Sequence, residues 1–475
     1  MIRRFNRTKI VTTIGPASTD KHMLEKIIRA GADVCRINSS HGDHDMMKKI
    51  IDNVRELNKE LQCHVAILFD LQGPKLRIGD VENQGVILVD GQTILLTNTE
   101  CIGTREKLFI SYPQFHKDVE VGEKVLIDDG KLELQITDIK GEEVFAKVTH
   151  GGLLTSKKGI NLPNTNISLP SLSEKDRKDL DFALANDVDW IGLSFVRKPK
   201  DITDLKAIIK KSEKLSRVIA KIEKPEAVKN IDEIISVSDG IMVARGDLGV
   251  EMPMEKVPVI QKIIVKKCNT AAKPVIIATQ MMESMITNFR PTRAEANDVG
   301  NAVFDGADAL MLSAETSVGK FPVETVEAMQ KIINEVEKQD EIYFREMPPG
   351  KFSINVLSDS ISYTACTMAR QTNAKAILAM THSGYAAFRI AAHRPKSDIF
   401  IFTDNKPLLN TLNLLWGVRV FYYDKYESTD TTFKDIKQFL LDNNLVDAGE
   451  MVIHVASTPL HERSTANTIK LSIIE

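Results

Sequence analysis

The sequence has few cysteines, no long apolar run and almost no net charge. Its five cysteines are odd in number, scattered and without a C-x-x-C pair, so we expect neither a disulfide framework nor a structural zinc site. No run approaches ~18 apolar residues, so no membrane span is expected. Lys plus Arg total 62 and Asp plus Glu 65, and the net charge of −3 gives no general attraction to nucleic acid or to anionic membranes.

The start of the chain lacks the pattern of a signal peptide. Lys9, Thr12 and Thr13 interrupt the stretch that follows the basic first residues, so we expect a cytoplasmic protein. Hydrophobic residues at 43% and charged residues at 27% are typical of a globular protein and exclude disorder as the main state. At ~150 residues per domain, the chain is long enough for about three domains.

Eight short apolar runs predict a parallel barrel. Most are followed by an amphipathic helical pattern, and their Val and Ile content is typical of strands buried on both faces. The runs are Lys9–Ile14, Asp33–Ile37, Val65–Phe69, Trp190–Phe195, Val218–Ile222, Gly240–Ala244, Val275–Ala278 and Ala309–Leu312. Eight strand–helix units are what a (β/α)8 barrel needs.

Two further regions depart from the barrel pattern. Roughly 115 residues separate Asp70 from Asp187, too many for an ordinary connection. They hold short strand patterns and turn glycines, which predict a small β-barrel lid domain inserted at 71–171. The barrel then covers 1–70 and 172–345, and renewed alternation after Pro348-Pro349-Gly350 predicts a C-terminal open α/β domain at 346–475.

Polar residues gather where the predicted barrel strands end, which is where barrel active sites form. Each alone is explained by capping of the next helix, but their coincidence at so many strand ends favours a site. They are Arg36, Asn38, Ser40, His41, Asp70, Ser194, Arg197, Lys221, Glu223, Arg245, Gly246, Asp247, Thr279, Gln280, Ser313 and Glu315.

Lys221, Glu223 and Asp247 suggest phosphoryl chemistry. Lys221 and Glu223 lie on the same side of a strand, either as a satisfied ion pair or as a charge clamp beside a metal-bound carboxylate. Asp247 supplies a second carboxylate, and two carboxylates with substrate oxygens and water suit Mg²⁺. Gly246 stands in a plain turn or in a helix start whose N–H groups hold a substrate carboxylate.

Other candidates are weaker. Thr279 is a helix cap or a proton donor, and His41 is a structural cap or a site residue. The pair Lys157-Lys158 is a solvated turn unless lid closure brings it to a polyphosphate. The segment Thr381–Tyr385 offers hydroxyls and N–H groups at a helix start, which suit either an ordinary cap or a phosphorylated effector.

Several motifs together resemble those of the pyruvate kinase family, and the similarity extends from Lys9 to the last strand. They are Arg36-Ile37-Asn38-Ser39-Ser40-His41-Gly42, Asp70-Leu71-Gln72-Gly73-Pro74-Lys75-Leu76-Arg77, Lys221-Ile222-Glu223, Met242–Gly249, Ala278–Met285 and Pro291–Glu295. The resemblance implies transfer of the phosphoryl group of phosphoenolpyruvate to ADP, giving pyruvate and ATP in the last step of glycolysis, by a homotetramer.

The resemblance also implies a role for each matching position. Lys221 is similar to the transition-state lysine and Arg36 to the phosphoenolpyruvate-binding arginine. Glu223 and Asp247 are similar to the ligands of Mg²⁺ or Mn²⁺. The resemblance places Gly246, Asp247 and Thr279 at the substrate carboxylate and the proton relay, and Arg77 and Lys158 at the nucleotide phosphates. It places Asn38, Ser40, His41 and Asp70 at the edge that binds the nucleotide and a monovalent cation. It also implies an effector loop at Thr381–Tyr385.

Lys75 departs from the usual family pattern. Many members resemble one another in having glutamate at this position, and in having Thr, Lys and Thr where this chain has Leu71, Gln72 and Ile78. We expect the Lys75 ammonium to lie near Asp70 and replace K⁺, so that K⁺ is not required. A pocket of Asn38, Ser40, Asp70 and the Leu71 carbonyl would then remain in outline only. The alternative is that Lys75 points to solvent and K⁺ still binds.

Two rival functions remain open. A pyruvate-using aldolase or lyase would also need a metal, but it would not need Arg77, Lys157-Lys158 or a β insertion. A catalytically inactive scaffold predicts the loss of at least one of Lys221, Glu223, Asp247 and Thr279, and all four are present.

Overall fold

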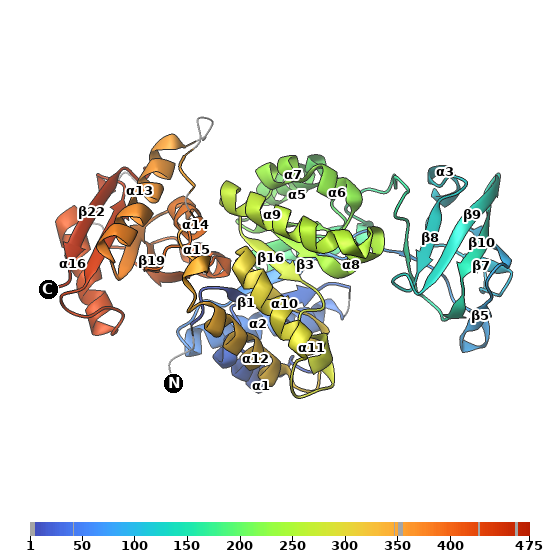
Figure 1. Cartoon of the computed structure of the whole chain (residues 1–475), viewed down its shortest axis with the longest axis horizontal. Helices are drawn as coiled ribbons and strands as arrows, with labels where there is room; N and C mark the ends of the chain where they lie inside the picture. Colours follow the sequence, from blue (N-terminus) through green and yellow to red (C-terminus); the bar gives the residue numbers. More distant parts are fainter. Residues whose placement is uncertain (1–4, 41, 346, 350–354, 426–427, 461–463) are drawn as a thin grey trace.

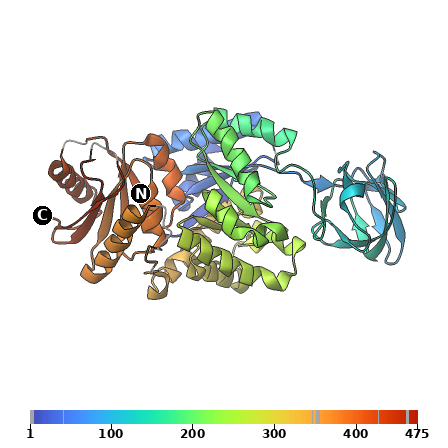
Figure 2. The same ribbon diagram turned by 90° about the horizontal axis from the view of Figure 1, so that it is seen from above.

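The computed structural model describes residues 5–40, 42–345, 347–349, 355–425, 428–460 and 464–475. Three parts lie in a row along the longest axis, with a barrel in the middle, a β insertion at one end and an α/β part at the other (Figures 1 and 2). The expected fold class is confirmed.

Eight parallel strands close into the barrel in the order β1-β17-β16-β15-β14-β13-β3-β2. All eight predicted runs form these strands, and their residues are almost entirely buried because helices cover the outer face. Their bounds are β1 Lys9–Thr13, β2 Val34–Asn38, β3 Ala66–Asp70, β13 Trp190–Leu193, β14 Arg217–Ile222, β15 Gly240–Ala244, β16 Val275–Ala278 and β17 Ala309–Leu312.

Amphipathic helices surround the barrel. α1 shows why they form: Asp20 caps its first turn by accepting the N–H groups of His22 and Met23, Leu24 and Ile27 are buried, and Gly31 ends it with φ of 129°. The others are α2 His44–Glu60, α4 Glu174–Ala185, α5 Pro199–Lys211, α6 Pro225–Lys229, α7 Ile231–Val237, α8 Arg245–Glu251, α9 Val257–Ala271, α10 Arg293–Asp305, α11 Ala314–Ser317 and α12 Pro322–Val336; α1 is Lys21–Ala30. Among the described helices, none has the length and apolar character needed to cross a bilayer.

The insertion leaves the barrel after β3 and is built from short strands around its own apolar core. Its larger sheet has the order β4-β12-β8-β9-β10-β6-β7, and β11 pairs with β5. Val144, Ala146 and Val148 of β10 are buried, while Glu143 before them and Lys147 between the last two are exposed, as expected for a sheet with one solvated face. The strands are β4 Leu76–Arg77, β5 Val86–Leu88, β6 Thr93–Thr97, β7 Lys107–Phe109, β8 Lys124–Ile127, β9 Leu132–Lys140, β10 Glu143–His150, β11 Gly152–Leu154 and β12 Gly159–Asn161, with the single-turn helix α3 Phe115–Asp118.

The C-terminal part is an open five-stranded sheet with the order β20-β19-β18-β21-β22 and helices beside it. The elements are α13 Val356–Thr372, β18 Ala376–Met380, α14 Tyr385–Ala392, β19 Asp398–Thr403, α15 Lys406–Thr411, β20 Val418–Tyr422, α16 Thr429–Asp442, β21 Met451–Ala456 and β22 Thr468–Ile473. The strand β22 is not predicted from the sequence pattern; it pairs antiparallel with β21 at the sheet edge. None of its residues is buried, and it lacks the continuous apolar run that marks the other strands.

The C-terminal part packs against the amino ends of the barrel strands. Arg394 pairs with Asp308 at 3.0 Å, and Trp190 Nε1 donates to the Thr411 carbonyl at 3.1 Å. The insertion follows the carboxyl end of β3, so it lies at the carboxyl ends of the barrel strands, opposite the C-terminal part. The candidate site lies on that side.

Candidate active site

Four charged side chains form a continuous chain at the carboxyl ends of β2, β3 and β14. Arg36 donates from Nε to Asp70 Oδ2 at 2.8 Å, and its Nη2 lies 2.6 Å from the same oxygen. Lys221 Nζ lies 3.3 Å from Asp70 Oδ1 and 3.0 Å from Glu223 Oε1. We call Arg36, Asp70, Lys221 and Glu223 the upper-rim chain. Because two cations alternate with two carboxylates, each charge is stabilised before any substrate enters.

Burial makes these charges sensitive to one another. Burial opposes ionisation of Asp70, but the cations of Lys221 and Arg36 outweigh it and hold the Asp70 pKa below its usual value. Burial also disfavours the charged Lys221, yet Asp70 and Glu223 raise the pKa of the lysine overall. Lys221 is therefore a permanent cation at the mouth of the barrel, as a clamp for a phosphoryl group requires.

Ser194 connects Lys221 to the start of the insertion. Lys221 Nζ donates to Ser194 Oγ at 2.7 Å, and that hydroxyl donates to the Leu71 carbonyl, also at 2.7 Å. Gly192 lies beside this arrangement, where a Cβ atom would come within 2.9 Å of Asp70 Oδ1. Only glycine leaves Asp70 its present position.

Glu223 and Asp247 come close enough for their charges to interact. Glu223 Oε2 accepts the N–H of Phe195 at 2.7 Å. Burial raises the pKa of Glu223, Lys221 opposes that rise, and the negative charge of Asp247 adds to it. A divalent cation would relieve this repulsion, so the two carboxylates fit a Mg²⁺ site completed by substrate and water. Among the described residues, no cluster of three or more His, Cys, Asp or Glu side chains has metal-binding geometry.

Thr279 occupies a strained turn after β16. Thr279 and the following Gln280 have φ of 71° and 52°, a backbone region that non-glycine residues adopt at a cost and that is common at active sites. Arg245 holds this turn by donating to the Thr279 carbonyl at 2.8 Å while pairing with Asp298 at 2.7 Å.

The Thr279 hydroxyl donates to the Ala278 carbonyl and accepts the N–H of Gly246, both at 2.6 Å. The sequence pattern allows either a plain turn here or N–H groups that receive a substrate carboxylate. The N–H of Gly246 is bonded to Thr279 instead, because the β16 turn brings the threonine hydroxyl against the first turn of α8.

Arg77 and Lys158 both lie on the insertion and are bonded within it. Arg77 Nη1 donates to the Lys157 carbonyl at 2.9 Å, and Lys158 Nζ lies 2.9 Å from Asp128. A cavity of about 960 Å³ separates the insertion from the barrel. Its lining includes Lys75, Asp129 and Gly130 of the insertion and Gly246, Asp247 and Gln280 of the barrel.

The expected position of Lys75 beside Asp70 is not observed. Lys75 is exposed and its side chain lies against Gly159 of β12, and no ion pair joins it to Asp70 within the described residues. The reason is that Asp70 is already enclosed by Arg36 and Lys221, which lie on barrel strands.

The outlined cation pocket is also partly occupied by the protein itself. Asn38 Oδ1 accepts the N–H of Ser40 at 3.1 Å, and the Leu71 carbonyl accepts the Ser194 hydroxyl. His41 lies outside the described residues.

Two contacts of this site are not predictable from the sequence: the Phe195 N–H that fixes Glu223, and the pairing of Arg245 with Asp298. A backbone donor leaves no trace in side-chain chemistry, although Phe195 has an unusual φ of 53°. The contacts of Glu251 with Lys224 and Asn161 are not predictable either, because they join distant segments of the chain.

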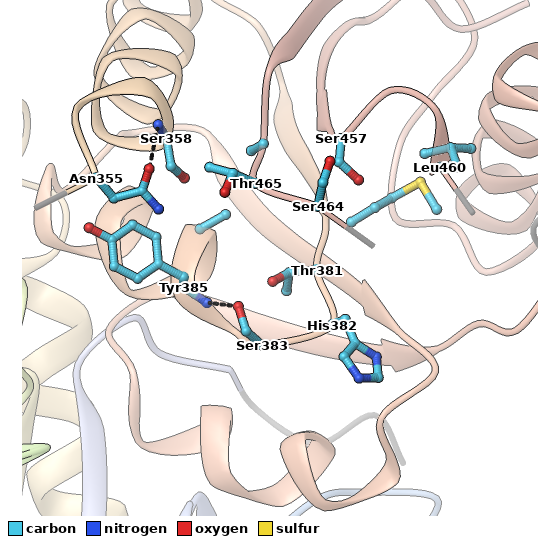
Figure 3. A pocket seen from close by; sticks show the side chains of 13 residues that line it. Asn355, Ser358, Thr381, His382, Ser383, Tyr385, Ser457, Leu460, Ser464 and Thr465 are labelled. Carbon is cyan, nitrogen blue, oxygen red and sulfur yellow. Dashed lines mark hydrogen bonds between the residues drawn. The ribbon is translucent and has the colours of Figure 1, made fainter. Parts of the chain in front are cut away.

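A second cavity, of about 260 Å³, lies in the C-terminal part (Figure 3). Thr381 and Ser383 line it from the loop between β18 and α14, Tyr385 lines it from the first turn of α14, and Ser457 and Ser464 face them across the cavity. None of the described lining residues is Lys or Arg. The segment Ser457–Ser464 includes residues 461–463, which lie outside the described residues.

Comparison with known proteins gives one family. A model described as the pyruvate kinase barrel domain matches residues 5–326, and one described as the pyruvate kinase alpha/beta domain matches 359–472. The chain is 41% identical to the pyruvate kinase of Geobacillus stearothermophilus over 471 residues and 40% identical to that of Staphylococcus aureus strain MRSA252 over 476 residues, covering 98% of this chain and 80% of each relative. The crystal structure of a pyruvate kinase from Cryptosporidium parvum superposes with a TM-score of 0.94 at 35% identity, covering 99% of this chain and 96% of that one.

Proposed function

Because the chain belongs to the pyruvate kinase family, we propose that it transfers the phosphoryl group of phosphoenolpyruvate to ADP, giving pyruvate and ATP in the last step of glycolysis. The observation that carries this proposal at the level of residues is the upper-rim chain, in which a buried, permanently charged Lys221 lies between Asp70 and Glu223. Phosphoryl transfer depends on alignment and charge neutralisation more than on covalent help. The four residues of the upper-rim chain supply both the alignment and the neutralising charge.

Each residue has a distinct task. Lys221 and Arg36 stabilise the phosphoryl oxygens while the bond to the enol oxygen breaks and the bond to ADP forms. Arg77 and Lys158 bind the nucleotide phosphates when the insertion closes, and Asn38 and His41 contact the nucleotide. Gly246, Asp247 and Thr279 border the pyruvate moiety, where the Thr279 hydroxyl relays a proton to the enolate carbon.

Glu223 and Asp247 would hold Mg²⁺, or Mn²⁺, because their mutual repulsion calls for a cation and two carboxylates are the usual protein share of such a site. When bound, the metal supplies positive charge to the phosphoryl oxygens. Closure of the insertion excludes water that would compete with ADP as acceptor.

A coupled assay that follows pyruvate formation from phosphoenolpyruvate, ADP and Mg²⁺ tests the proposal. ADP-dependent turnover is expected. Pyruvate release without ADP would mean that water accepts the phosphoryl group, as in a phosphatase, and would contradict the proposal. The absence of any reaction with phosphoenolpyruvate would favour a pyruvate-using aldolase or lyase, and phosphoenolpyruvate binding without turnover would favour an inactive scaffold.

K⁺ is proposed to be unnecessary. The support is the lysine at position 75, which lies on the cavity side of the insertion, together with the engagement of Asn38 and the Leu71 carbonyl in protein hydrogen bonds. In the described arrangement Lys75 does not reach Asp70, so its charge acts when the insertion closes.

Thr381–Tyr385 is proposed to bind a phosphorylated effector. Hydroxyl groups and the start of the eight-residue helix α14 support it, since N–H groups at a helix start favour anions. Titration of phosphorylated sugars and nucleotides against the phosphoenolpyruvate saturation curve tests it, with Thr381→Ala as the variant. If none of these ligands shifts the curve, the cavity is structural.

A homotetramer is proposed as well. Val259 and Ile263 of α9 and Leu471 and Ile473 of β22 are apolar and exposed, which is typical of surfaces that pair with another copy. Light scattering of the purified protein would give the assembly directly. The proposed domains are 1–70 with 172–345, 71–171 and 346–475, and the location is the cytoplasm, where phosphoenolpyruvate and ADP are available.

A further inference from the structure

A buried ion pair to which the proposed mechanism gives no task joins the residue after Glu223 to a residue one helical turn after Asp247. Lys224 Nζ donates to Glu251 Oε1 at 2.5 Å, and the two side chains are 8% and 0% exposed. The second carboxylate oxygen of Glu251 is buried and has no hydrogen-bond partner. Stability alone does not explain such a pair, because the cost of removing two charges from water cancels much of their attraction.

The position of this pair relates it to both candidate metal ligands. Lys224 directly follows Glu223, and Glu251 lies four residues after Asp247, one turn along the same face of α8. Glu223 and Asp247 repel each other across the gap between β14 and α8. The attraction of Lys224 for Glu251 spans that same gap and opposes the repulsion.

The insertion contacts the same carboxylate. Asn161, the last residue of β12, donates from its amide to Glu251 Oε1 at 2.8 Å. β12 pairs with β4, which carries Arg77, and with β8. A movement of the insertion therefore acts on Glu251, and through α8 on Asp247.

We propose that Lys224 and Glu251 are positioning residues that hold the carboxylates of Glu223 and Asp247 at the separation a divalent cation requires, and that Asn161 couples this pair to the insertion. The inference rests on the proposed function, since it takes Glu223 and Asp247 as the metal ligands. It adds three residues that contact neither substrate nor metal.

Direct binding of Mn²⁺ to the substrate-free enzyme tests the inference, with free Mn²⁺ followed by electron paramagnetic resonance. Glu251→Gln and Lys224→Met should each weaken Mn²⁺ binding by about 10–100-fold, the usual effect of removing a partner behind a metal ligand. Asn161→Ala should weaken it by a smaller factor. Lys206→Met, which removes a lysine paired with Asp239 at the other end of the barrel, and Asn166→Ala, on an exposed residue of the same segment as Asn161, are matched controls that should bind like the parent.

The double variant Lys224→Met with Glu251→Leu keeps the test decisive if a single variant fails to fold. It replaces both charges by apolar groups, so it should unfold at nearly the parent temperature and still bind Mn²⁺ weakly. Parent-like Mn²⁺ affinity in this variant would overturn the inference.

Glu223→Gln distinguishes the role of Glu223 as a metal ligand from the positioning role of Lys224 and Glu251. If it abolishes Mn²⁺ binding while the double variant binds normally, only the present inference fails. If Glu223→Gln has no effect, the metal assignment of the proposed function fails, and this inference fails with it.

Discussion

Carboxylates lie at both ends of the barrel, and their partners differ. At the amino ends, four aspartates directly precede a strand, and Oδ2 of each accepts an N–H of a neighbouring strand at 2.7 to 3.1 Å. Each aspartate also forms an ion pair with a lysine or arginine, at 2.7 to 4.0 Å. We call this set the lower rim; its pairs are Asp33 with Lys9, Asp189 with Arg55, Asp239 with Lys206 and Asp308 with Arg394.

The upper-rim chain has the opposite balance. Burial raises the pKa of Asp189 on the lower rim despite the nearby Arg55, whereas Lys221 and Arg36 outweigh burial and lower the pKa of Asp70. Lower-rim carboxylates are bonded by backbone donors and lie beside cations. On the upper rim two cations share Asp70 and Lys221 also pairs with Glu223, at the mouth of the barrel where the cations can meet an anionic substrate. The same residue types therefore stabilise the barrel at one end and prepare it for chemistry at the other.

The largest effect is expected on the lower rim, from Arg394→Met. Arg394 is 1% exposed and bonds Asp308, Asn269 and the Gly306 carbonyl, so its removal leaves a buried carboxylate unpaired. The free energy of unfolding should fall by about 3–5 kcal/mol, while turnover per folded molecule stays unchanged. Urea unfolding followed by circular dichroism measures the first quantity. Arg55→Met, which removes a more exposed partner of Asp189, should cost less.

Lys221→Met is expected to lower turnover and not phosphoenolpyruvate binding. Turnover should fall by about 10²–10³-fold or more because the lysine charge is needed where negative charge gathers in the transition state, while phosphoenolpyruvate binding stays nearly intact. Steady-state kinetics and equilibrium binding separate the two effects. Lys206→Met removes a lysine–aspartate pair of the lower rim and should leave kcat unchanged. Unchanged kcat in Lys221→Met would remove this lysine from the mechanism.

The sequence predicts much of this comparison, but not all of it. The eight strands are recognisable because burial on both faces leaves continuous apolar runs, and the upper-rim residues are recognisable because they are polar where such runs end. The four lower-rim aspartates also stand at the starts of these runs, but their cationic partners come from β1, α2, α5 and the C-terminal part. Pairing between distant segments is not encoded in any local pattern, which is also why β22 and the Asn161 contact with Glu251 were missed.

Gly192→Ala tests how closely the upper rim is packed. A Cβ at this position would come within 2.9 Å of Asp70 Oδ1 and displace the carboxylate that orients both cations. We expect kcat/KM to fall by about 10–100-fold, since small misplacements at a reacting centre have effects of this size. Gly300→Ala in α10 is the matched control, because its Cβ would meet Val336 at an ordinary 3.6 Å. Equal activity in both variants would mean that the upper rim tolerates movement of Asp70.

The smallest effect is expected from K⁺, and it tests whether the positive charge of the upper rim is complete. Lys221 and Arg36 already enclose Asp70, and closure of the insertion would bring Lys75 as a third cation, which would disfavour a further one by like-charge repulsion. With Mg²⁺ present, replacing a tetraalkylammonium salt by KCl at constant ionic strength should change the rate by less than about twofold, because a lysine ammonium is a compact cation able to act in place of K⁺. In Lys75→Glu the insertion brings a negative charge instead, so activity should become dependent on K⁺, whereas Lys124→Glu, on an exposed residue elsewhere in the insertion, should not create such dependence. Strong activation of the unmodified enzyme by K⁺ would show that the lysine at position 75 does not complete the rim, and that the donors near Asn38 and Leu71 open to admit the ion.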